Sequence, residues 1–347
     1  MKRILIIRPT AIGDIVMASP MIQEMRNAWP NAYIAWLADP SVSDLLRHNP
    51  SLDEIIYWPK ARYKKLAKKG RWFELAGEVI NIRRKLRRLR FDLAIDAQGL
   101  FRSRLLAWLS GAPERIGFDS KEPGRCLMTR VISRGYKKGY MSSEYYYMME
   151  VLGLSPASFK PDIHLSETDM EKTGKKLNGV GVDGDYAVIC PFTTRPQKHW
   201  FVNRWAELSD EIEKQNHLSV VMLGGPNDAG YSRRIESLAK GRLYNLTGQM
   251  TLGQAAAVIK TAALVIGVDT GLTHLGTAFE RPTAALFGAT CPYLRTSSRR
   301  TVVLYKQMPC SPCRRRPVCS DEYTCMYDIS VDDVVKIVDK LLTPTVI

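Results

Sequence analysis

Short apolar runs alternate with amphipathic stretches along almost the whole chain, and this alternation limits the folds open to it. In the first half, the runs predicted as buried strands are residues 3–7, 32–38, 55–58 and 91–99. In the second half, they are residues 186–190, 218–226, 263–271 and 283–289. Stretches with helical spacing separate these runs, and parallel strands need helical crossovers to reach their neighbours. The pattern therefore predicts an α/β fold with doubly wound parallel sheets.

The helices expected between the strands are residues 19–30, 41–50, 72–90, 204–215, 251–262 and 272–280. A last helix is expected at 330–342, with Ser330 as N-cap and Asp333 completing a near capping box. A chain of 347 residues is too long for one hydrophobic core to be the simplest expectation. Turn-forming residues between 155 and 180 mark the boundary, so we predict domains over residues 1–165 and 170–328, followed by a helical segment at 329–347.

Two such domains are expected to enclose a central cleft, with the ligand at the carboxyl ends of the strands. No signal-peptide pattern begins the sequence, and no apolar run approaches the roughly 18 residues of a membrane span. We therefore expect a cytoplasmic protein that touches a membrane surface. Seven cysteines without a secretion signal favour reduced thiols or a metal site over disulfides.

The net charge of +15 is concentrated in residues 60–90, which hold 13 Lys and Arg against Glu74 and Glu78. Such a stretch forms either a solvated helix face or a surface for a polyanion, which would be nucleic acid, anionic lipid headgroups or a phosphorylated glycolipid. Tyr63, Trp72 and Phe73 lie among these charges. That mixture suits a membrane interface at least as well as nucleic acid.

The segment RPTAIGDIVMASP, residues 8–20, follows the first predicted strand and contains one carboxylate, Asp14. A carboxylate at a strand-to-helix turn either caps the helix or acts as a general base. The residues of this segment alone leave both interpretations open.

The segment 267–292 joins a predicted strand directly to a helix through Asp269, Thr270 and Gly271. The free N–H groups of a first helical turn form a phosphate site, and glycine allows a ligand to approach the backbone closely. His274 lies in the first helical turn, beside this proposed anion site. The alternative is that Asp269 or Thr270 only caps the helix.

Two further loops of the second half carry polar groups after predicted strands. In TTRPQKHW, residues 193–200, two hydroxyl groups and a cation suit a pyrophosphate, although an ordinary polar loop has the same composition. In LGGPND, residues 223–228, Asp228 is placed to accept hydrogen bonds from a ribose. Neither a GxGxxG fingerprint nor a GxxxxGK[ST] loop occurs, which argues against a dinucleotide fingerprint site and a P-loop triphosphatase.

Two loops of the first half are predicted to meet a polar acceptor molecule. Asp96, Gln98 and Arg102 follow the strand predicted at 91–99, and Glu122 lies in the turn-rich segment 120–125.

Four cysteines gather near the end of the chain, with the spacing C-x2-C-x5-C-x5-C. They are Cys310, Cys313, Cys319 and Cys325. Four thiolates so close in sequence are able to close a structural zinc or iron site, and the alternative is a loop of reduced cysteines. The neighbouring Arg314, Arg315 and Arg316 are expected to lower the thiol pKa values.

Together these motifs resemble those of the ADP-heptose–lipopolysaccharide heptosyltransferases of glycosyltransferase family 9. The resemblance is carried by the strand and GD turn at 4–14, DAQGL at 96–100, EP at 122–123, TTRPQKHW at 193–200, GGP at 224–226 and VDTGLTHL at 268–275. It implies the GT-B fold, in which two Rossmann-like domains with parallel sheets face a central cleft and the final helix packs back toward the N-terminal domain. It also implies an inverting, metal-independent reaction.

The resemblance implies that the C-terminal domain binds the ADP-sugar donor. Thr193, Thr194 and Lys198 would contact the donor phosphates, Asp228 the ribose and Met250 the adenine end. The pyrophosphate loop would comprise Asp269, Thr270, Gly271, Leu272 and His274. Catalysis would rest on Asp14 as general base and on Lys198 at the leaving diphosphate.

The resemblance also implies that the N-terminal domain binds the lipopolysaccharide inner core on lipid A. The acceptor contacts would be Gly13, Asp96, Gln98, Arg102, Glu122, Lys64 and Lys65. The cysteine-rich segment is similar to the second-heptose branch, whereas TTRPQKHW and DAQGL are similar to the first-heptose branch, so both Kdo and heptose remain open as acceptor sugars. We expect a peripheral protein on the cytoplasmic face of the inner membrane, on an anionic surface and without nucleic acid. The alternatives are another acceptor position, a noncatalytic sugar-nucleotide-binding protein, and a nucleic-acid-binding protein with a zinc module.

Overall fold

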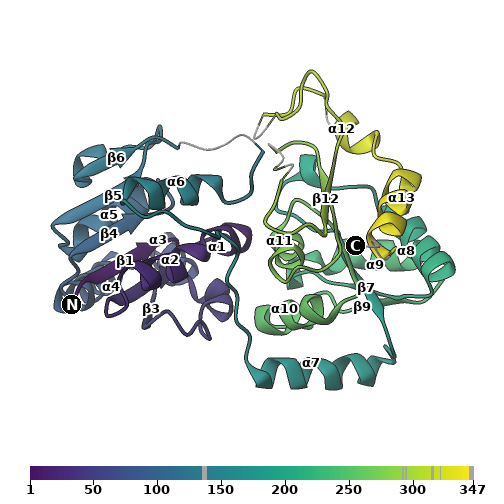
Figure 1. The fold of residues 1–347 in the computed structure, drawn as a ribbon, viewed down its shortest axis with the longest axis horizontal. Helices are drawn as coiled ribbons and strands as arrows, with labels where there is room; N and C mark the ends of the chain where they lie inside the picture. The colour runs from purple at the N-terminus through teal and green to yellow at the C-terminus, as the bar shows by residue number, and fades with distance from the viewer. Residues whose placement is uncertain (135–138, 291–292, 294, 314–315, 321, 344–347) are drawn as a thin grey trace. The chain divides into compact units, whose positions relative to one another are not determined.

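The computed structural model describes residues 1–134, 139–290, 293, 295–313, 316–320 and 322–343, which form two compact units (Figure 1). The first unit comprises residues 1–137 and 142–164, and the second comprises residues 138–141 and 165–347. The division at residue 164 lies beside the boundary expected between residues 165 and 170.

The first unit is built on a six-stranded parallel sheet with the order β3-β2-β1-β4-β5-β6. Its strands are β1 (Arg3–Ile7), β2 (Tyr33–Ala38), β3 (Glu54–Tyr57), β4 (Leu93–Asp96), β5 (Glu114–Phe118) and β6 (Arg130–Ile132). Leu5 in β1 lies beside Ala35 of β2 and Ala94 of β4, and all three are fully buried. The chain proceeds outward from β1 in one direction and from β4 in the other, so the topological switch point lies between β1 and β4.

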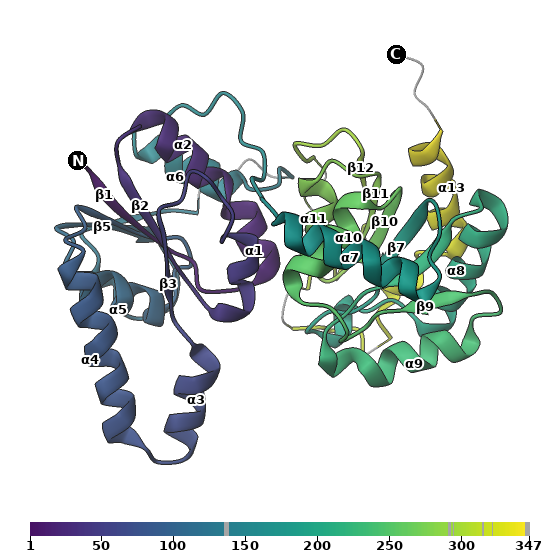
Figure 2. The ribbon, with the colours of Figure 1, turned by 90° about the horizontal axis from the view of Figure 1, so that it is seen from below.

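The helices of the first unit are α1 (Ile12–Ala18), α2 (Pro20–Ala28), α3 (Lys60–Lys68), α4 (Trp72–Arg88), α5 (Phe101–Ser110) and α6 (Ser143–Val151), with short 3₁₀ helices at Pro40–Leu45 and Arg125–Leu127. Figure 2 shows α3 and α4 as a hairpin that extends away from the sheet. The helix expected at 41–50 is only the 3₁₀ helix Pro40–Leu45. Asp39 accepts a hydrogen bond from Ser41 N, and aspartate and serine side chains favour such local turns over a long helix.

The second unit repeats this architecture with the strand order β12-β11-β10-β7-β8-β9, again all parallel. Its strands are β7 (Tyr186–Cys190), β8 (Ser219–Met222), β9 (Leu243–Asn245), β10 (Leu264–Val268), β11 (Thr283–Phe287) and β12 (Thr301–Tyr305). Here the switch point lies between β7 and β10. The predicted fold class, two Rossmann-like units with parallel sheets, is confirmed.

The helices of the second unit are α7 (Glu167–Val180), α8 (Val202–Asn216), α9 (Ala229–Leu238), α10 (Leu252–Thr261), α11 (Gly271–Ala278), α12 (Thr324–Tyr327) and α13 (Val331–Leu342), with 3₁₀ helices at Pro196–Lys198 and Pro226–Asp228. The capping box expected at the last helix is present. Asp333 N donates to Ser330 Oγ at 3.1 Å, and Ser330 N donates to Asp333 Oδ2 at 3.1 Å. None of the helices, within the residues described, is long and apolar enough to cross a bilayer.

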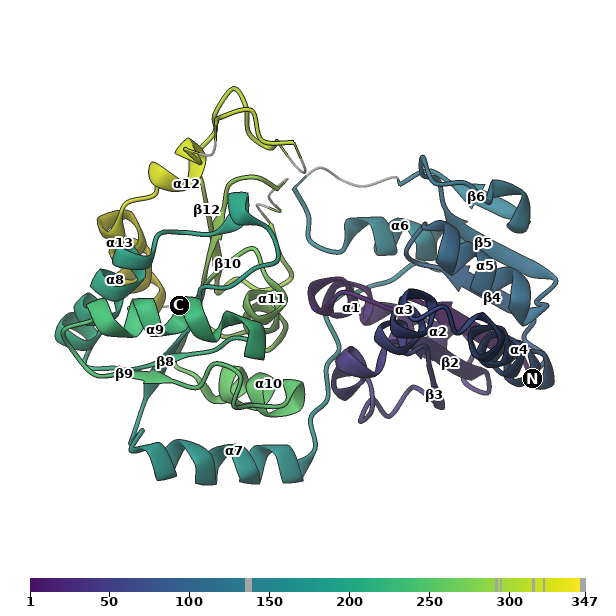
Figure 3. The same ribbon diagram turned by 180° about the vertical axis from the view of Figure 1, so that it is seen from behind.

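The apolar face of α13 packs within the second unit. Val334 and Val338 are fully buried in its core, and Figure 3 shows α13 beside α8. The sequence analysis expected this helix to pack toward the N-terminal domain. Within the second unit, α13 contacts α8 and β11, and its valines complete the apolar layer over the sheet.

Gly267 of β10 provides a test of how closely α11 packs on this sheet. A Cβ atom at Gly267 would lie 2.1 Å from Thr273 Oγ1 and 2.8 Å from Cys190 Cβ. We expect Gly267→Ala to lower the free energy of unfolding by about 1–3 kcal/mol through overpacking. Gly230→Ala is the control, because a Cβ at this position in α9 meets nothing within 4 Å. Gly230→Ala should leave the free energy of unfolding, measured in urea, unchanged or slightly raised. If the two variants were equally stable, close packing at Gly267 would be contradicted.

Candidate active site

The loops that follow β7 and β10 lie at the switch point of the second sheet. In doubly wound sheets this is where ligands bind, since the loops on either side diverge and leave room between them. Lys198 stands at the end of the loop after β7, and Asp269 follows β10 directly.

A buried carboxylate, Asp269, joins these loops. Lys198 Nζ and Thr290 Oγ1 each lie 2.5 Å from Asp269 Oδ2, while His274 Nε2 lies 3.2 Å from Oδ1. His274 Nδ1 in turn lies 2.5 Å from the hydroxyl of Tyr293. The structure therefore brings together three residues predicted for the donor site, Lys198, Asp269 and His274. Thr290 and Tyr293 were not predicted.

Burial and charge act in opposite directions on this carboxylate. Burial by itself raises the pKa of Asp269, but hydrogen bonding and charge from His274 and Lys198 outweigh it and hold that pKa well below its ordinary value. Burial, together with the charge of Asp269, raises the pKa of Tyr293 well above its ordinary value. The cluster therefore holds an ionised carboxylate beside a lysine and a protonated phenol.

The first turn of α11 supplies backbone donors next to this cluster. Thr270 is the N-cap residue, but its side chain makes no capping hydrogen bond, and Asp269 is engaged by Lys198 and His274 instead. Capping by either side chain, the alternative interpretation, is therefore not observed. Gly271 and Leu272 are half-buried at the helix start. Their position leaves the helix N-terminus suited to an anion.

Thr193 and Thr194 belong to the same loop as Lys198, where Thr193 is half-buried and Thr194 is exposed. The carbonyl of Thr193 lies 2.9 Å from His199 Nε2, which fixes the loop. Burial lowers the pKa of His199, with the Thr193 carbonyl and Asp228 opposing. His199 is therefore suited to hold the loop as a neutral ring.

Asp228 and Met250 lie in two turns that contact each other. Gly248 N donates to Gly224 O at 2.9 Å, which joins the GGP turn to the turn that ends at Met250. Asp228 is half-buried, and its Oδ2 accepts from Gly225 N at 2.8 Å. That bond shapes the turn and leaves the other carboxylate oxygen as the candidate ribose contact.

In the first unit, a buried arginine holds Asp14. Arg8 and Asp14 form an ion pair in which the Arg8 side chain is 7% exposed and that of Asp14 is 35% exposed. Ala11 N also donates to Asp14 Oδ2, at 3.2 Å, so Asp14 shapes the start of α1 as well. Arg8 further donates to Ala97 O after β4, at 2.9 Å, and accepts through its own carbonyl from Trp36 Nε1 at 3.1 Å.

Arg8 was not predicted, because an arginine next to a strand carries no sequence signal of burial. Burial lowers the pKa of Arg8, but Tyr145, Asp14 and Glu144 outweigh this and raise it above the ordinary value. Arg8 is therefore a permanent cation beneath the Asp14 carboxylate.

Asp96 is not presented to a ligand as the sequence analysis expected. It is fully buried, and its Oδ1 accepts from Gln98 N at 3.0 Å and from Gly99 N at 2.9 Å, so it shapes the turn after β4. Gln98 is half-buried and donates to Thr10 O at 3.4 Å, while its own carbonyl accepts from Arg134 at 2.6 Å. Gln98 therefore lies next to the segment that carries Asp14.

Arg102 on α5 and Glu122 in the 120–125 loop are both exposed. A buried arginine that was not predicted, Arg104, positions this loop. It donates to Glu122 O at 2.6 Å, to Pro123 O at 3.0 Å and to Phe118 O at 3.0 Å. The side chain of Glu122 is thereby held on an ordered backbone.

The other predicted acceptor contacts lie on helices. Gly13 is buried in the first turn of α1, directly before Asp14, and Lys64 and Lys65 are exposed on α3.

Comparison with known proteins decides the family. The profile described as glycosyltransferase family 9 (heptosyltransferase) matches residues 79–324, more than half of the chain. The chain belongs to glycosyltransferase family 9. This confirms the resemblance drawn from its motifs.

The similar proteins agree with this assignment. Lipopolysaccharide heptosyltransferase 1 of Pseudomonas aeruginosa is 26% identical over 335 residues, which cover 95% of this chain and 89% of that protein. A family 9 glycosyltransferase from Veillonella parvula has the same fold, with a TM-score of 0.83, 22% identity, and coverage of 98% and 97% of the two chains. The Escherichia coli heptosyltransferase WaaC with ADP-2-deoxy-2-fluoro heptose gives a TM-score of 0.71, with 23% identity over 97% and 99%.

The four cysteines of this family 9 protein, Cys310, Cys313, Cys319 and Cys325, are free thiols. Among the residues described, which include all four, no group of three or more His, Cys, Asp or Glu side chains is arranged to hold a metal ion. The predicted zinc or iron site is therefore not shown by the described residues. Burial, followed by the other thiols of the cluster, raises the pKa of Cys313 and Cys325, contrary to the lowering expected from the arginines. Arg314 and Arg315 lie outside the described residues.

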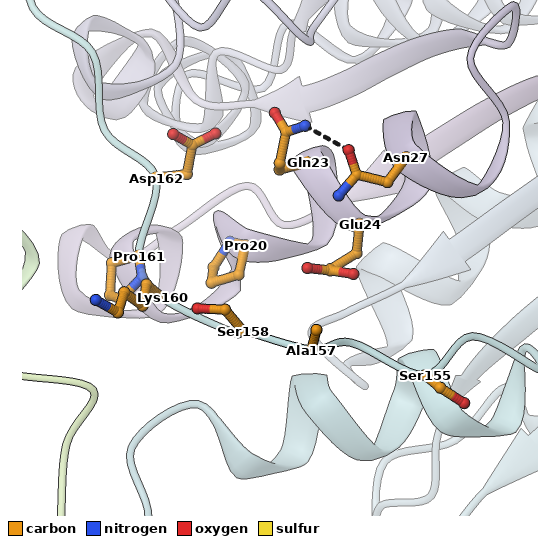
Figure 4. A pocket seen from close by; sticks show the side chains of 10 residues that line it. All are labelled: Pro20, Gln23, Glu24, Asn27, Ser155, Ala157, Ser158, Lys160, Pro161 and Asp162. Carbon is orange, nitrogen blue, oxygen red and sulfur yellow. Dashed lines mark hydrogen bonds between the residues drawn. The ribbon is translucent and has the colours of Figure 1, made fainter.

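A hollow of about 540 Å³ lies in the first unit between α2 and the segment 155–162 (Figure 4). Two of its polar residues, Gln23 and Asp162, are held by hydrogen bonds. Gln23 donates to Asn27 at 2.7 Å, and Asp162, whose Oδ2 accepts from Asn49 at 2.7 Å, also donates through its backbone to Ser19 Oγ. The hollow contains none of the predicted site residues, and we assign it no role in the reaction.

The lowered pKa of Asp269 predicts an acid-sensitive second unit. An ionised, paired carboxylate stabilises the folded state above the unfolded pKa of about 4, and this stabilisation is lost as the pH falls below that value. Asp269→Asn should lower the free energy of unfolding by about 3 kcal/mol at neutral pH and flatten its dependence on acid pH. Urea unfolding from about pH 3 to about pH 8 measures both effects. The control is Asp183→Asn, at an exposed position. If the stability of Asp269→Asn fell with acid pH as steeply as that of the wild type, Asp269 would not be the source of the acid sensitivity.

Proposed function

We propose that this protein is an inverting heptosyltransferase that transfers heptose from ADP-heptose to the inner core of lipopolysaccharide, on Kdo or heptose. The observation that carries the proposal is the family 9 match across residues 79–324. The lipopolysaccharide heptosyltransferase of Pseudomonas aeruginosa, which is similar over 95% of this chain, supports the substrate class.

The donor is proposed to bind the second unit. WaaC, whose fold this chain shares, was solved with an ADP-heptose analogue, which supports an ADP-sugar here. Lys198 carries three N–H donors and gives one to Asp269, so two remain for the diphosphate. The first turn of α11, from Thr270 to Leu272, and the hydroxyls of Thr193 and Thr194 add further donors. Asp228 is assigned to the ribose and Met250 to the adenine.

Asp14 is proposed as the general base. Arg8 and Ala11 N both engage Oδ2, and among the described residues no hydrogen bond reaches Oδ1. Oδ1 would therefore take the proton from an acceptor hydroxyl as that oxygen attacks the anomeric carbon of the heptose. The bond between this carbon and the ADP oxygen breaks on the opposite face, which inverts the centre. A single displacement needs one base, unlike the carboxylate pair of most glycoside hydrolases.

The departing ADP carries the electron pair of the broken bond as additional negative charge. Lys198 and the N-terminus of α11 would stabilise this charge. The protein's own groups would thereby stabilise the leaving ADP without a metal ion. Asp269 and His274 would hold Lys198 in place for this step. Asp269 would in this way act by positioning.

The acceptor is proposed to bind the first unit. Gln98, beside Thr10, and the exposed Arg102 and Glu122 are the candidate sugar contacts. Lys64 and Lys65 would pair with phosphates of the inner core. Because this acceptor is anchored in a bilayer by lipid A, we place the protein at the cytoplasmic face of the inner membrane. The alternative functions are transfer to another acceptor position and sugar-nucleotide binding without transfer.

Asp14→Asn tests the base. Asparagine keeps the shape of the side chain but cannot take a proton, so we expect acceptor-dependent ADP release to fall by about 10²- to 10⁴-fold. Binding of ADP should remain within a few-fold of wild type.

Asp53→Asn is the matched control. Asp53 is 38% exposed and pairs with Arg26 at 2.7 Å, but it precedes β3 and so lies at the amino end of a strand. It should retain its turnover. Near-normal turnover in Asp14→Asn would remove Asp14 from the role, and ADP binding without release in the wild-type protein with any core acceptor would favour the noncatalytic alternative.

Lys198→Met tests the stabilisation of the diphosphate. Loss of a charged hydrogen-bond donor should weaken ADP binding by about 10- to 100-fold and lower kcat as well, because charge on the diphosphate increases in the transition state. Titration calorimetry with ADP and steady-state kinetics measure the two effects. The control is Lys306→Met, which removes a lysine paired with Asp333 at 3.0 Å in the same unit. Wild-type ADP affinity in Lys198→Met would contradict its assignment.

A further inference from the structure

The helices α3 and α4 form a protruding hairpin, residues 60–88, which we call the basic hairpin. Residues 69–71 join the two helices at its tip, and Figure 2 shows the tip extending away from the sheet of the first unit. Gly70, with a φ of +68°, makes the tight turn there.

The basic hairpin buries very little of its own surface. In α3 only Leu66 is buried, and in α4 only Ile82 and Leu86, which lie in its second half. Tyr63 is half-buried and packs edge-on against Trp58 at 4.4 Å, so it belongs to the folded part of the unit. The first half of α4 therefore has no core of its own to explain its apolar residues.

Those apolar residues form a stripe that faces solvent. Trp72 is 62% exposed, Phe73 is 96% exposed and Ile80 is 45% exposed. Phe73, Ala76, Gly77 and Ile80 follow the spacing i, i+3, i+4, i+7, which places them on one side of a helix. This is the pattern of an amphipathic helix whose apolar side is left uncovered by the described structure.

The charge around the tip is positive and largely unneutralised. Residues 60–71 contain seven Lys and Arg and no acid. Glu78 pairs with Arg62 at 2.5 Å, and Glu74 pairs with Arg71. The five remaining lysines of α3 and the turn are exposed and have no ion pair among the described residues; they are Lys60, Lys64, Lys65, Lys68 and Lys69.

From these observations we infer that the basic hairpin docks on an anionic phospholipid bilayer, with Trp72 and Phe73 inserted at the level of the headgroups and with Lys60, Lys68 and Lys69 on the lipid phosphates. A protruding apolar stripe removes alkyl and aromatic surface from water when it enters a bilayer. Tryptophan prefers the interface, and lysines extend their charges back to it. The inference does not rest on the proposed reaction.

Nucleic acid fits this surface less well. A polynucleotide would be bound by the lysines and would stack on exposed rings, but it offers no apolar layer to Ala76 and Ile80. A bilayer satisfies the cationic side and the apolar stripe together.

The test measures binding of the full chain to vesicles that contain neither lipopolysaccharide nor donor. Flotation with mixed phosphatidylglycerol–phosphatidylcholine vesicles is compared with pure phosphatidylcholine vesicles at low and high salt. The insertion variant is Trp72→Ser with Phe73→Ser, and its control is Trp108→Ser, which removes a tryptophan 44% exposed on α5. The charge variant is Lys68→Gln with Lys69→Gln, and its control is Lys336→Gln with Lys340→Gln on α13.

The wild-type protein should bind the anionic vesicles, less strongly as salt increases, and bind the neutral vesicles weakly. The insertion variant should lose at least about 10-fold in partitioning, since aromatic burial is lost. The charge variant should lose roughly 5-fold for each lysine removed, on anionic vesicles only. Both controls should match wild type, and circular dichroism verifies that all variants fold.

Three results would overturn the inference. These are absence of wild-type binding to anionic vesicles, wild-type partitioning of the insertion variant, and tight binding of a random-sequence DNA duplex that excludes vesicles. The vesicles contain no acceptor, so none of these results bears on the transferase activity. Conversely, a variant that loses turnover but still binds the vesicles would bear on the transferase proposal and not on the docking surface.

Discussion

The ion pair and hydrogen bonds of one buried carboxylate, Asp269, organise the candidate donor site. Its partners come from the loops after three strands that are neighbours in the sheet: Lys198 follows β7, His274 lies in α11 after β10, and Thr290 follows β11. A charge buried to this degree is stable only when it is paired and hydrogen-bonded, so these loops are held to one arrangement. The start of α11 and the ammonium group of Lys198 are thereby kept close to the same carboxylate, which is what a site for a diphosphate requires.

The first unit also joins two loops through a buried charged side chain, but this side chain has the opposite charge. There the buried partner is a cation, Arg8, which joins the loop after β1 to the loop after β4 through Ala97 O. Asp14 is the more exposed partner of this ion pair. The two switch points therefore offer different chemistry on similar architecture. The second unit presents donors suited to an anion, whereas the first presents a carboxylate oxygen suited to accept a proton. This difference agrees with a donor bound by one unit and an acceptor activated by the other.

Much of the architecture was predictable, because the strands of a parallel sheet are short apolar runs with turn residues at their ends. Four strands were not predicted, because they are short, half-buried or begin with polar residues. β6 and β9 have three residues each, β12 is half-buried at the sheet edge, and β5 begins with the polar Glu114 and Arg115. Among the residues predicted for the donor site, Lys198 and His274 both contact Asp269 in the structure. Asp96 was assigned to a ligand but is buried in a turn, because a carboxylate after a strand serves equally well as an Asx turn.

The sequence by itself determined the fold class, the family and the loops that carry the chemistry. The spacing of apolar residues, the turn residues and the motifs are all local properties of the chain. Only the tertiary structure decided which partner each charge has. Arg8 and Asp14 are six residues apart, yet the burial that makes Arg8 a support for Asp14 depends on β2 and β4. The roles of Tyr293, Thr290 and Arg104 likewise depend on contacts between residues that are distant in the sequence. The exposure of Phe73 and Trp72 was likewise decided by packing, because an apolar helical stripe has the same sequence whether a core covers it or solvent does.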